Sequence, residues 1–407
     1  MKAVRKAVFW AHLAVGCAAG LLILTMSVTG ILLAFERQIN AKADEPAVLA
    51  SQTSTAGQAP VDILLAKLNS SGQGVPSQVV LHSSAKMPVE ARYGREKSLL
   101  LNPWTAEVIG QPNESTRGFF GAVERIHRSV GLGMRSALGR GATGAANLAF
   151  LFMLISGLYL WLPKVWSAAS VKVRCLFRRG VKGRTREWNW HNVVGIWVAF
   201  PLLFIVGSGV VISYPWANDL LYTMTGSKAP IGGTFRGAGQ AEQGEQGPHN
   251  GRASDAGDVV ALRSLDEMVQ TAKRQIPAWK SITVDVPHGN LRVLNLSVDV
   301  SVGGQPEKAQ QLVMNRETGQ VDAVKRFSDN VVGRRLHAYA RFVHTGEEFG
   351  VAGEAIAALA SLGAVVLVWT GLSMALRRLL ATASGEERIA KIAAADRGEL
   401  GGETAGV

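Results

Sequence analysis

The sequence has little of what soluble metal, nucleotide and hydrolytic sites depend on. Its 407 residues include only two cysteines, Cys17 in an apolar run and Cys175 in a basic one, so no cysteine cluster can hold zinc or an iron–sulfur centre. No C-x-x-C-H occurs, which excludes covalent c-type haem attachment. No G-x-G-x-x-G lies between a predicted strand and a helix, and no H-E-x-x-H or Ser–His–Asp arrangement is present. These absences remove the common nucleotide-binding and hydrolytic classes.

Charge is also scarce, because charged residues make up 18% of the chain while hydrophobic residues make up 47%. A helix needs about 20 mostly apolar residues to cross a bilayer. Four windows have that character: Ala7–Phe35, Ala145–Leu162, Val193–Tyr214 and Ala355–Leu376. They carry few ionisable side chains, chiefly His12, and no pair of carboxylates. The chain is therefore predicted to be an α-helical membrane protein with four transmembrane helices.

The positions of the Lys and Arg residues predict an orientation in the membrane. Basic residues gather at 2–6, at 164–187 and at 377–378. By the positive-inside rule these segments are cytoplasmic, and both termini are cytoplasmic with them. The two long connections, roughly 36–142 and 215–350, are then periplasmic, which places the chain in a bacterial inner membrane. This asymmetry accounts for most of the net charge of +12 without a nucleic-acid partner.

A cleaved signal peptide is the competing interpretation of the N-terminus, with Ala41-Lys42-Ala43 as its cleavage site. The apolar stretch is longer than the usual signal-peptide core of about 7–15 residues. It also has a counterpart of full length later in the chain. We therefore expect residues 1–36 to remain as a transmembrane helix.

The first and third apolar windows share a pattern. Trp10-Ala11-His12 opens the first and Trp190-His191 opens the third. A glycine follows each histidine by four residues, at Gly16 and Gly195. Agreement at several positions together indicates duplication more strongly than any one match.

The second and fourth windows correspond in the same way. Ser156-Gly157 in the second matches Thr370-Gly371 in the fourth, and His127 and His344 each precede a glycine by six residues just before these windows. Matching helices run in the same direction through the membrane. The pattern therefore predicts two parallel repeats.

Both long connections have the pattern of a small α+β domain. Val61–Asn69 and Leu265–Gln275 have the spacing of short amphipathic helices. Strand-like runs follow each of them, and residues 101–108 match 314–321 as a hairpin with a polar turn. The strand-like runs are Gln78–His82 and Ser98–Val108 in the first region, and Ser281–Val286, Arg292–Val300 and Gln310–Val321 in the second.

These observations predict an order of segments along the chain. Residues 1–36 form transmembrane helix 1, 37–117 the first periplasmic domain, 118–164 a juxtamembrane segment with transmembrane helix 2, and 165–188 a basic cytoplasmic loop. Residues 189–216 form transmembrane helix 3, 217–260 a linker rich in Gly, Gln and Ala, 261–330 the second periplasmic domain, 331–378 a juxtamembrane segment with transmembrane helix 4, and 379–407 a cytoplasmic tail. The composition of the linker cannot bury a core, so it is expected to be flexible.

With these motifs the chain resembles the PepSY-associated transmembrane family. The motifs that carry the resemblance are Trp10-Ala11-His12, residues 101–105, Ile126-His127-Arg128, residues 156–161, Trp190-His191 and residues 343–346, and together they extend over roughly residues 1–378. The resemblance implies a PepSY-like domain in each periplasmic region. The family includes iron-regulated membrane proteins and ferrisiderophore reductases with haem in the membrane. The resemblance therefore also implies haem b, two per chain, and reduction of ferric siderophores.

His12 and His191 form a matched pair at the cytoplasmic ends of equivalent spans. Two imidazoles from facing helices can ligate one haem iron from opposite sides. The alternative is that both rings only mark the membrane interface. Small residues lie on the same helical face as the two histidines, and they either make room for a flat porphyrin or permit close helix–helix contact. These residues are Gly16, Gly20, Gly195 and Ala199.

A second matched pair lies on the periplasmic side. It consists of His127 and His344, which are candidates for ligating a second haem iron. His337 lies seven residues before His344, close to the same helical face, and is a third candidate. The sequence leaves open whether His337 or His344 is the partner of His127.

Two haems stacked across the bilayer would carry electrons from the cytoplasmic to the periplasmic face. Our hypothesis is that they reduce Fe(III) in a ferric siderophore, whose hard ligands hold Fe(II) poorly. The electron donor must be external, either a quinol or a cytoplasmic reductant. The basic loop could dock such a reductant, although topology alone explains its charge. The alternative is a non-enzymatic accessory protein for siderophore or metal uptake, or for peptidase regulation through the PepSY-like domains.

Overall fold

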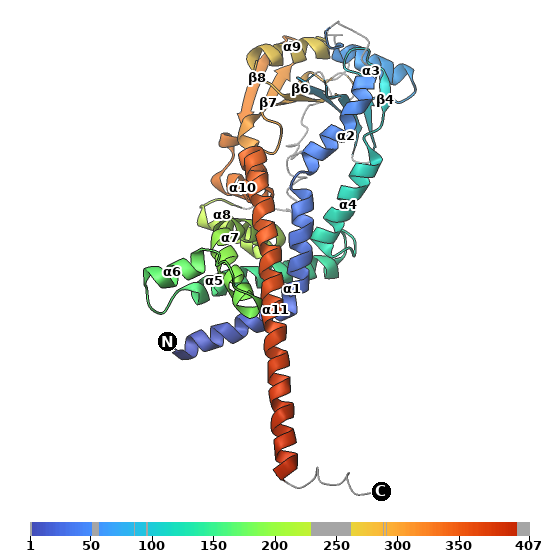
Figure 1. Ribbon diagram of the computed structural model, residues 1–407. Helices are drawn as coiled ribbons and strands as arrows, with labels where there is room; N and C mark the ends of the chain where they lie inside the picture. The colour runs from blue at the N-terminus through green and yellow to red at the C-terminus, as the bar shows by residue number, and fades with distance from the viewer. Residues whose placement is uncertain are drawn as a thin grey trace, which may run out of the picture. The chain divides into compact units, whose positions relative to one another are not determined.

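The computed structural model describes residues 2–50, 57–84, 86–94, 97–228, 262–287, 289 and 291–396 (Figure 1). The chain forms two compact units. The first comprises Met1–Ile31, His127–Val206 and Leu359–Val407, and the second comprises Leu32–Ile126 and Gly207–Ala358. Most of the predicted linker at 217–260 lies outside the described residues, and its first part belongs to helix α8 (Pro215–Met224).

The first unit is built from long apolar helices. They are α1 (Lys2–Leu33), α5 (Ala137–Trp161), α7 (Gly183–Ser213) and the part of α11 (Gly350–Asp396) that follows residue 358. Within the described residues, four helical stretches are long and apolar enough to cross a membrane: Ala3–Glu45, Ala137–Trp161, Gly183–Ser213 and Glu347–Ala381. All four predicted windows are therefore found as helices of membrane-spanning length.

The helices extend beyond the predicted windows. Helix α5 begins at Ala137 because the Ser136 hydroxyl caps its first turn, accepting a hydrogen bond from the Gly139 N–H at 3.1 Å. Helix α11 continues through the first part of the predicted polar tail to Asp396. Apolar runs mark the part of a helix that matches the bilayer, so they miss polar turns at its ends.

Buried side chains from three helices form the core of the first unit. Leu154 of α5 packs with Leu202 and Val206 of α7 and with Ala360 and Ala364 of α11. The Nδ2 of buried Asn147 donates to the Val206 carbonyl oxygen at 3.1 Å, so this amide also ties α5 to α7. The basic loop between α5 and α7 contains the short helix α6 (Ala168–Cys175).

The second unit contains one eight-stranded sheet in which every neighbouring pair is antiparallel. The strand order is β4-β3-β2-β1-β5-β6-β7-β8. The strands are β1 (Gln78–His82), β2 (Val89–Tyr93), β3 (Lys97–Leu101), β4 (Val108–Gly110), β5 (Ser281–Asp285), β6 (Val293–Asp299), β7 (Ala309–Asn315) and β8 (Val321–Arg326). Strand β1 pairs with β5 from Gln78 opposite Asp285 to His82 opposite Ser281.

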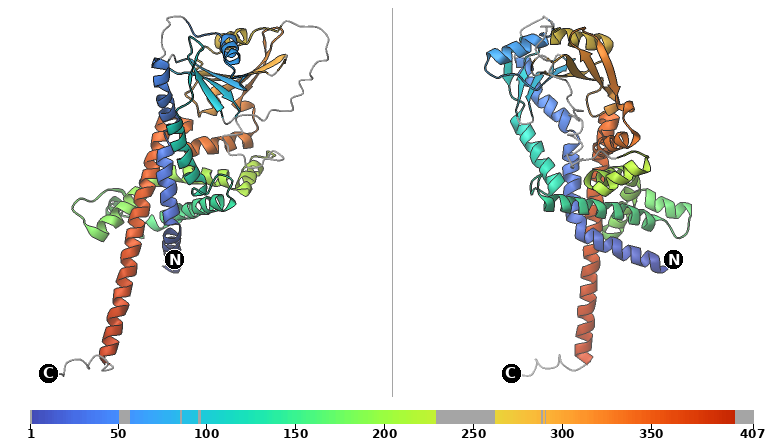
Figure 2. Two further views of the ribbon diagram at one scale, coloured as in Figure 1. Left: turned by 90° about the vertical axis from the view of Figure 1, so that its right-hand side faces the viewer. Right: turned by 180° about the vertical axis from the view of Figure 1, so that it is seen from behind.

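Strands from both predicted domains therefore belong to one sheet. The sequence predicts two separate small domains, one in each long connection. The pattern of either connection taken alone does not show that its strands pair with strands of the other. An edge strand carries unpaired N–H and C=O groups, and the β1–β5 pairing satisfies them. Helices α3 (Val61–Ser70) and α9 (Leu265–Gln275) lie over the same face of the sheet (Figure 2). Their buried side chains and those of the strands form one continuous core.

The two predicted hairpins are found as the pairs β3–β4 and β7–β8. The Oδ1 of Asn102 accepts hydrogen bonds from the N–H groups of residues 104 and 105, at 2.8 and 3.1 Å. The Oδ1 of Asn315 accepts from the N–H groups of residues 317 and 318, at 2.9 and 3.3 Å. Each asparagine thus organises its turn through its own side chain.

Several elements were not anticipated from the sequence. They are strand β2 and helices α2 (Glu36–Ala50), α4 (Glu114–Ser129) and α10 (Val332–Thr345). Strand β2 lacks an apolar outer face, because Glu90 and Arg92 occupy it as an ion pair at 2.8 Å. Helices α4 and α10 matter for the site, since α4 carries His127 and α10 carries His337 and His344.

Candidate functional site

His12 lies on α1 and is fixed by a hydroxyl on α5. Its Nδ1 is 2.8 Å from the Oγ of Ser156. The next residue, Gly157, has no side chain and so makes room for the imidazole ring. A Cβ at this residue would be only 3.3 Å from the His12 Cε1 atom. A larger side chain at residue 157 would push the ring away from Ser156. The Ser156-Gly157 pair therefore sets the position of this imidazole.

His191 lies on α7 and has the corresponding contacts with α11. Its Nδ1 is 2.9 Å from the Oγ1 of Thr370, and a Cβ on Gly371 would be 3.4 Å from its Cε1 atom. The dipeptide that holds this ring is the one that matches Ser156-Gly157 in the sequence. Both histidines are in the first unit.

His127 stands near the end of α4 and is held by α1. Its Nδ1 is 2.8 Å from the Oγ1 of Thr29, a residue only 6% exposed. Gly30 follows, and a Cβ there would be 3.7 Å from the His127 Cε1 atom. All three residues belong to the first unit. The hydroxyl-then-glycine pattern around His12 and His191 thus recurs at His127.

His344 and His337 lie on α10 in the second unit. The Nδ1 of His344 is 3.5 Å from the Oγ of Ser208 on α7, which is a weak hydrogen bond at best. The Nδ1 of His337 is buried without a hydrogen-bond partner among the described residues, and burial lowers the pKa of His337. His344, and not His337, therefore has the hydroxyl contact that His127 has. His127 and His344 fall in different units, and each is described within its own.

The small residues beside His12 and His191 face flexible side chains. A Cβ on Gly16 would be 2.9 Å from the Met153 Cε atom, and one on Gly195 would be 3.6 Å from a Leu367 methyl. A Cβ on Gly20 would be 3.4 Å from a Leu372 methyl, and Ala199 is buried. These contacts are close helix–helix contacts, as one of the two interpretations predicts. A planar group between the histidines would require the tips of these side chains to turn aside.

Cations lie over aromatic rings near His12 and His191 in the first unit. The Arg378 guanidinium lies 4.8 Å from the centre of the Trp10 ring, and Arg186 lies 5.7 Å from the centre of Trp190. Arg377 donates to buried Glu187 at 3.0 Å. Tryptophan is enriched at membrane interfaces, and arginine often stacks on its ring. Trp10 and Trp190 lie just before His12 and His191 in the sequence.

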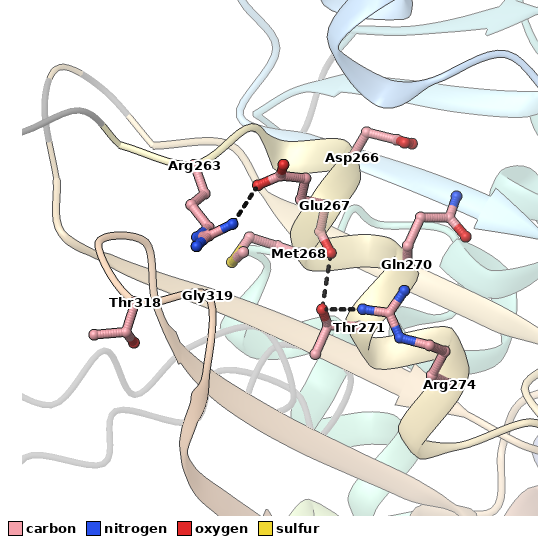
Figure 3. A pocket seen from close by; sticks show the side chains of 9 residues that line it. All are labelled: Arg263, Asp266, Glu267, Met268, Gln270, Thr271, Arg274, Thr318 and Gly319. Carbon is pink, nitrogen blue, oxygen red and sulfur yellow. Dashed lines mark hydrogen bonds and ion pairs between the residues drawn. The ribbon is translucent and has the colours of Figure 1, made fainter.

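The rest of the described chain offers little that could act as a second site. No group of three or more His, Cys, Asp or Glu side chains gathers there in a way that could hold a metal ion. A haem needs only two protein ligands, because the porphyrin supplies four nitrogens. A surface hollow of about 460 Å³ on α9 is lined by Arg263, Glu267, Thr271, Arg274 and their neighbours (Figure 3). Arg274 donates to Thr271 at 2.8 Å, so these side chains largely satisfy one another.

Sequence reasoning placed the histidines and missed the hydroxyls that hold them. In the sequence Ser156 and Thr370 stand out only as repeat markers, and Thr29 and Ser208 do not stand out at all. A hydroxyl at matched positions in two apolar helices was the available signal. Hydroxyls in such helices commonly bond to their own backbone, which is why the pattern alone did not identify them as partners.

Four helices of membrane-spanning length define an α-helical integral membrane protein, and its second unit carries an eight-stranded antiparallel sheet. The chain belongs to the family described as the PepSY-associated TM region, whose model matches residues 9–378. A comparison with curated protein sequences gives no significant match.

Proposed function

We propose that this chain is a haem-containing reductase of the bacterial inner membrane, which passes electrons across the membrane to ferric siderophore iron. Membership of the PepSY-associated family and the fixed histidines support the proposal together. The observation that carries it is the pair His12 and His191, which lie in one unit with each Nδ1 hydrogen-bonded to a hydroxyl. Ligation of iron through Nε2, with Nδ1 held by a hydrogen bond, is the usual arrangement of a metal-bound histidine.

In this proposal His12 and His191 hold one haem b, and His127 and His344 hold a second. When bound, haem supplies a one-electron centre that alternates between Fe(III) and Fe(II). Ser156 and Thr370 orient the first two rings, and Thr29 orients His127. The second pair rests on the two-repeat pattern of the sequence. The equal contacts at Ser156-Gly157 and Thr370-Gly371 support that pattern.

The basic residues at 2–6, 164–187 and 377–378 support a cytoplasmic position for the His12 and His191 end. Electrons enter there or from a quinol in the bilayer. The sheet unit is then periplasmic, where it meets the ferric siderophore. Reduction releases iron because Fe(II) is the softer and less highly charged ion, and hard oxygen ligands bind it less well.

The experiment is purification of the full chain and measurement of bound haem per protein. We expect a b-type spectrum with about two haems per chain, reduced by dithionite and reoxidised by a ferric siderophore. His12→Ala and His191→Ala should each remove one haem signal. His82→Ala is the matched control, because His82 lies on strand β1 of the sheet. A colourless protein, or a spectrum unchanged in the His12 and His191 variants, would overturn the proposal and favour the accessory role.

A further inference from the structure

Three of the five candidate histidines contact a hydroxyl that also lies within hydrogen-bond distance of a backbone carbonyl oxygen. The Oγ of Ser156 is 2.6 Å from the Phe152 carbonyl oxygen. The Oγ1 of Thr370 is 2.7 Å from the Val366 carbonyl oxygen. The Oγ1 of Thr29 is 2.7 Å from the Thr25 carbonyl oxygen. Each hydroxyl therefore bonds to the carbonyl four residues earlier in its own helix, a common habit of Ser and Thr.

The number of available protons shows which group donates in the hydrogen bond between each hydroxyl and its histidine ring. A hydroxyl has one proton to donate, and a carbonyl oxygen can only accept. The proton of each hydroxyl is therefore used at the backbone, and towards its histidine the oxygen must accept. The nitrogen that donates to it is Nδ1, at 2.8 Å in His12 and His127 and at 2.9 Å in His191. A neutral imidazole carries one proton, so Nε2 keeps its lone pair.

The opposite assignment fits the distances less well. It would require the hydroxyl to donate to Nδ1 and leave the carbonyl contact without a proton, although that contact is the shorter one at all three sites. The Thr370 hydroxyl also lies 3.2 Å from the Leu367 carbonyl oxygen, so a second acceptor is available to the same proton.

We infer that Ser156, Thr370 and Thr29 are positioning residues that hold His12, His191 and His127 as the Nδ1–H tautomer. Nε2 is the nitrogen able to ligate a metal in that tautomer. The assignment of the Nδ1–H tautomer depends only on the hydrogen bonds. The statement that Nε2 ligates iron rests on the proposed function. Ser208 is excluded from the inference, because its 3.5 Å contact with His344 is too long to fix a proton.

The direct test reads the tautomer in the full-length chain without haem. The chain is labelled with ¹⁵N-histidine, purified from haem-deficient cells in detergent, and its ring nitrogens are assigned by NMR at about pH 8, where imidazole is neutral. We expect His12, His191 and His127 to carry the proton on Nδ1. Ser156→Ala should release His12 alone from that tautomer, and Thr370→Val should release His191 alone. Protonation at Nε2 in the wild type, or no change in the variants, would overturn the inference.

Matched variants separate positioning from general damage. Ser156→Thr and Thr370→Ser keep the hydroxyl and should restore the Nδ1–H tautomer. Ser27→Ala is the control. The Ser27 hydroxyl also donates to the carbonyl four residues earlier, at 2.8 Å, and it lies on α1, the helix that carries His12. Its loss should leave all the tautomers unchanged. If Ser27→Ala alters them as much as Ser156→Ala does, the effect is structural and the inference fails.

A second measurement links the tautomer to the metal. In the haem-loaded chain, loss of a group that orients a metal-bound histidine typically costs 10–100-fold in affinity for the metal group. We expect Ser156→Ala and Thr370→Val each to weaken haem binding by about that factor, with recovery in the Ser/Thr exchanges. Haem binding that is unchanged in both variants would overturn the positioning role. A wild-type chain that binds no haem would defeat the proposed function, while the NMR result would still decide the tautomer.

Discussion

The carbonyl oxygen of Ser129 lies so close to Gly139 that a Cβ at residue 139 would collide with it. Ser129 ends α4 two residues after His127, and Gly139 is in the first turn of α5. The absence of a side chain at residue 139 therefore lets α4 approach α5 where His127 is held.

Gly139→Ala should displace the end of α4 and destabilise the first unit. Overpacking of this kind typically costs about 1–3 kcal/mol, so the melting temperature in detergent should fall by several degrees. Gly141→Ala is the control on the same helix, because no atom lies within 4 Å of the place that its methyl group would take. It should be neutral or slightly stabilising, since Ala is the better helix former. Equal melting temperatures for the two variants would show that the Ser129 contact is unimportant.

Methyl groups at Gly157 and Gly371 should disturb His12 and His191 to a similar degree. Each Cβ would come within 3.3–3.4 Å of a histidine Cε1 atom, so the ring would have to turn away from its hydroxyl. If the chain holds haem as proposed, both Gly157→Ala and Gly371→Ala should lower the absorbance of the main haem band per protein. Gly207→Ala on α7 should not, because its position is open. A loss in only one of the two variants would contradict the equivalence of the sites.

Asp44 anchors α4 to α2 in the second unit. The buried carboxylate accepts from the Asn113 N–H at 2.8 Å and from Arg117 at 3.0 Å. Removing a buried acceptor leaves its donors unsatisfied, at about 1–3 kcal/mol. Asp44→Ala should therefore lower the melting temperature and expose α4 to protease. Glu107→Ala removes only exposed contacts, the ion pair with Lys67 at 3.9 Å and a hydrogen bond from the Thr105 hydroxyl at 3.1 Å. Its effect should stay within about 0.5 kcal/mol. If α4 is cleaved equally fast in both variants, Asp44 is not its anchor.

The parts of the fold that depend on local pattern could be predicted from the sequence. The apolar windows identify the spanning helices because the bilayer demands a minimum length. Helix α9 at Leu265–Gln275 and strand β1 at Gln78–His82 were predicted with their observed bounds. The single sheet could not be predicted, because the β1–β5 pairing joins residues that are far apart in the chain. The residues of β1 alone do not show whether its edge pairs with another strand or faces solvent.

The candidate site was predictable to the same degree. Duplication alone selected His12, His191, His127 and His344, and three of them have a close hydroxyl contact. The partners themselves depend on how two helices face each other, which spacing within one helix does not determine. His337 and His344 both lie on one face of α10, and of the two only His344 approaches a hydroxyl, at 3.5 Å. Which of them is the partner of His127 stays a prediction.

Ala106 and Gly319 occupy equivalent places in the two hairpin turns, and they should respond in opposite ways to exchange. Both have a left-handed backbone, with φ of 59° and 79°. This conformation costs a residue with a Cβ about 1–2 kcal/mol. Gly319→Ala should be destabilising by about that amount, and its Cβ would also come within 2.9 Å of Arg263. Ala106→Gly should be nearly neutral, because relief of strain offsets the loss of a buried methyl. A large loss of melting temperature in Ala106→Gly would show that packing outweighs strain there.

Two buried histidines of the second unit should each contribute a loss of stability as the pH falls below about 6.5, the usual pKa of histidine. Burial lowers the pKa of His337, and burial is also the largest cause of the lowered pKa of His82, where Glu90 opposes the shift and Arg92 adds to it. Below that pH the unfolded chain binds protons at these rings before the native chain does, so protonation favours unfolding. Above it both states are neutral and the effect vanishes. The melting temperature of the wild type, relative to that of the double variant His82→Gln and His337→Gln, should therefore fall between about pH 7.5 and pH 5.5. Comparing the two proteins isolates the two rings from every other group that titrates over this range. A difference that stays constant, or that grows in favour of the wild type towards acid, would show that neither ring is kept neutral by burial.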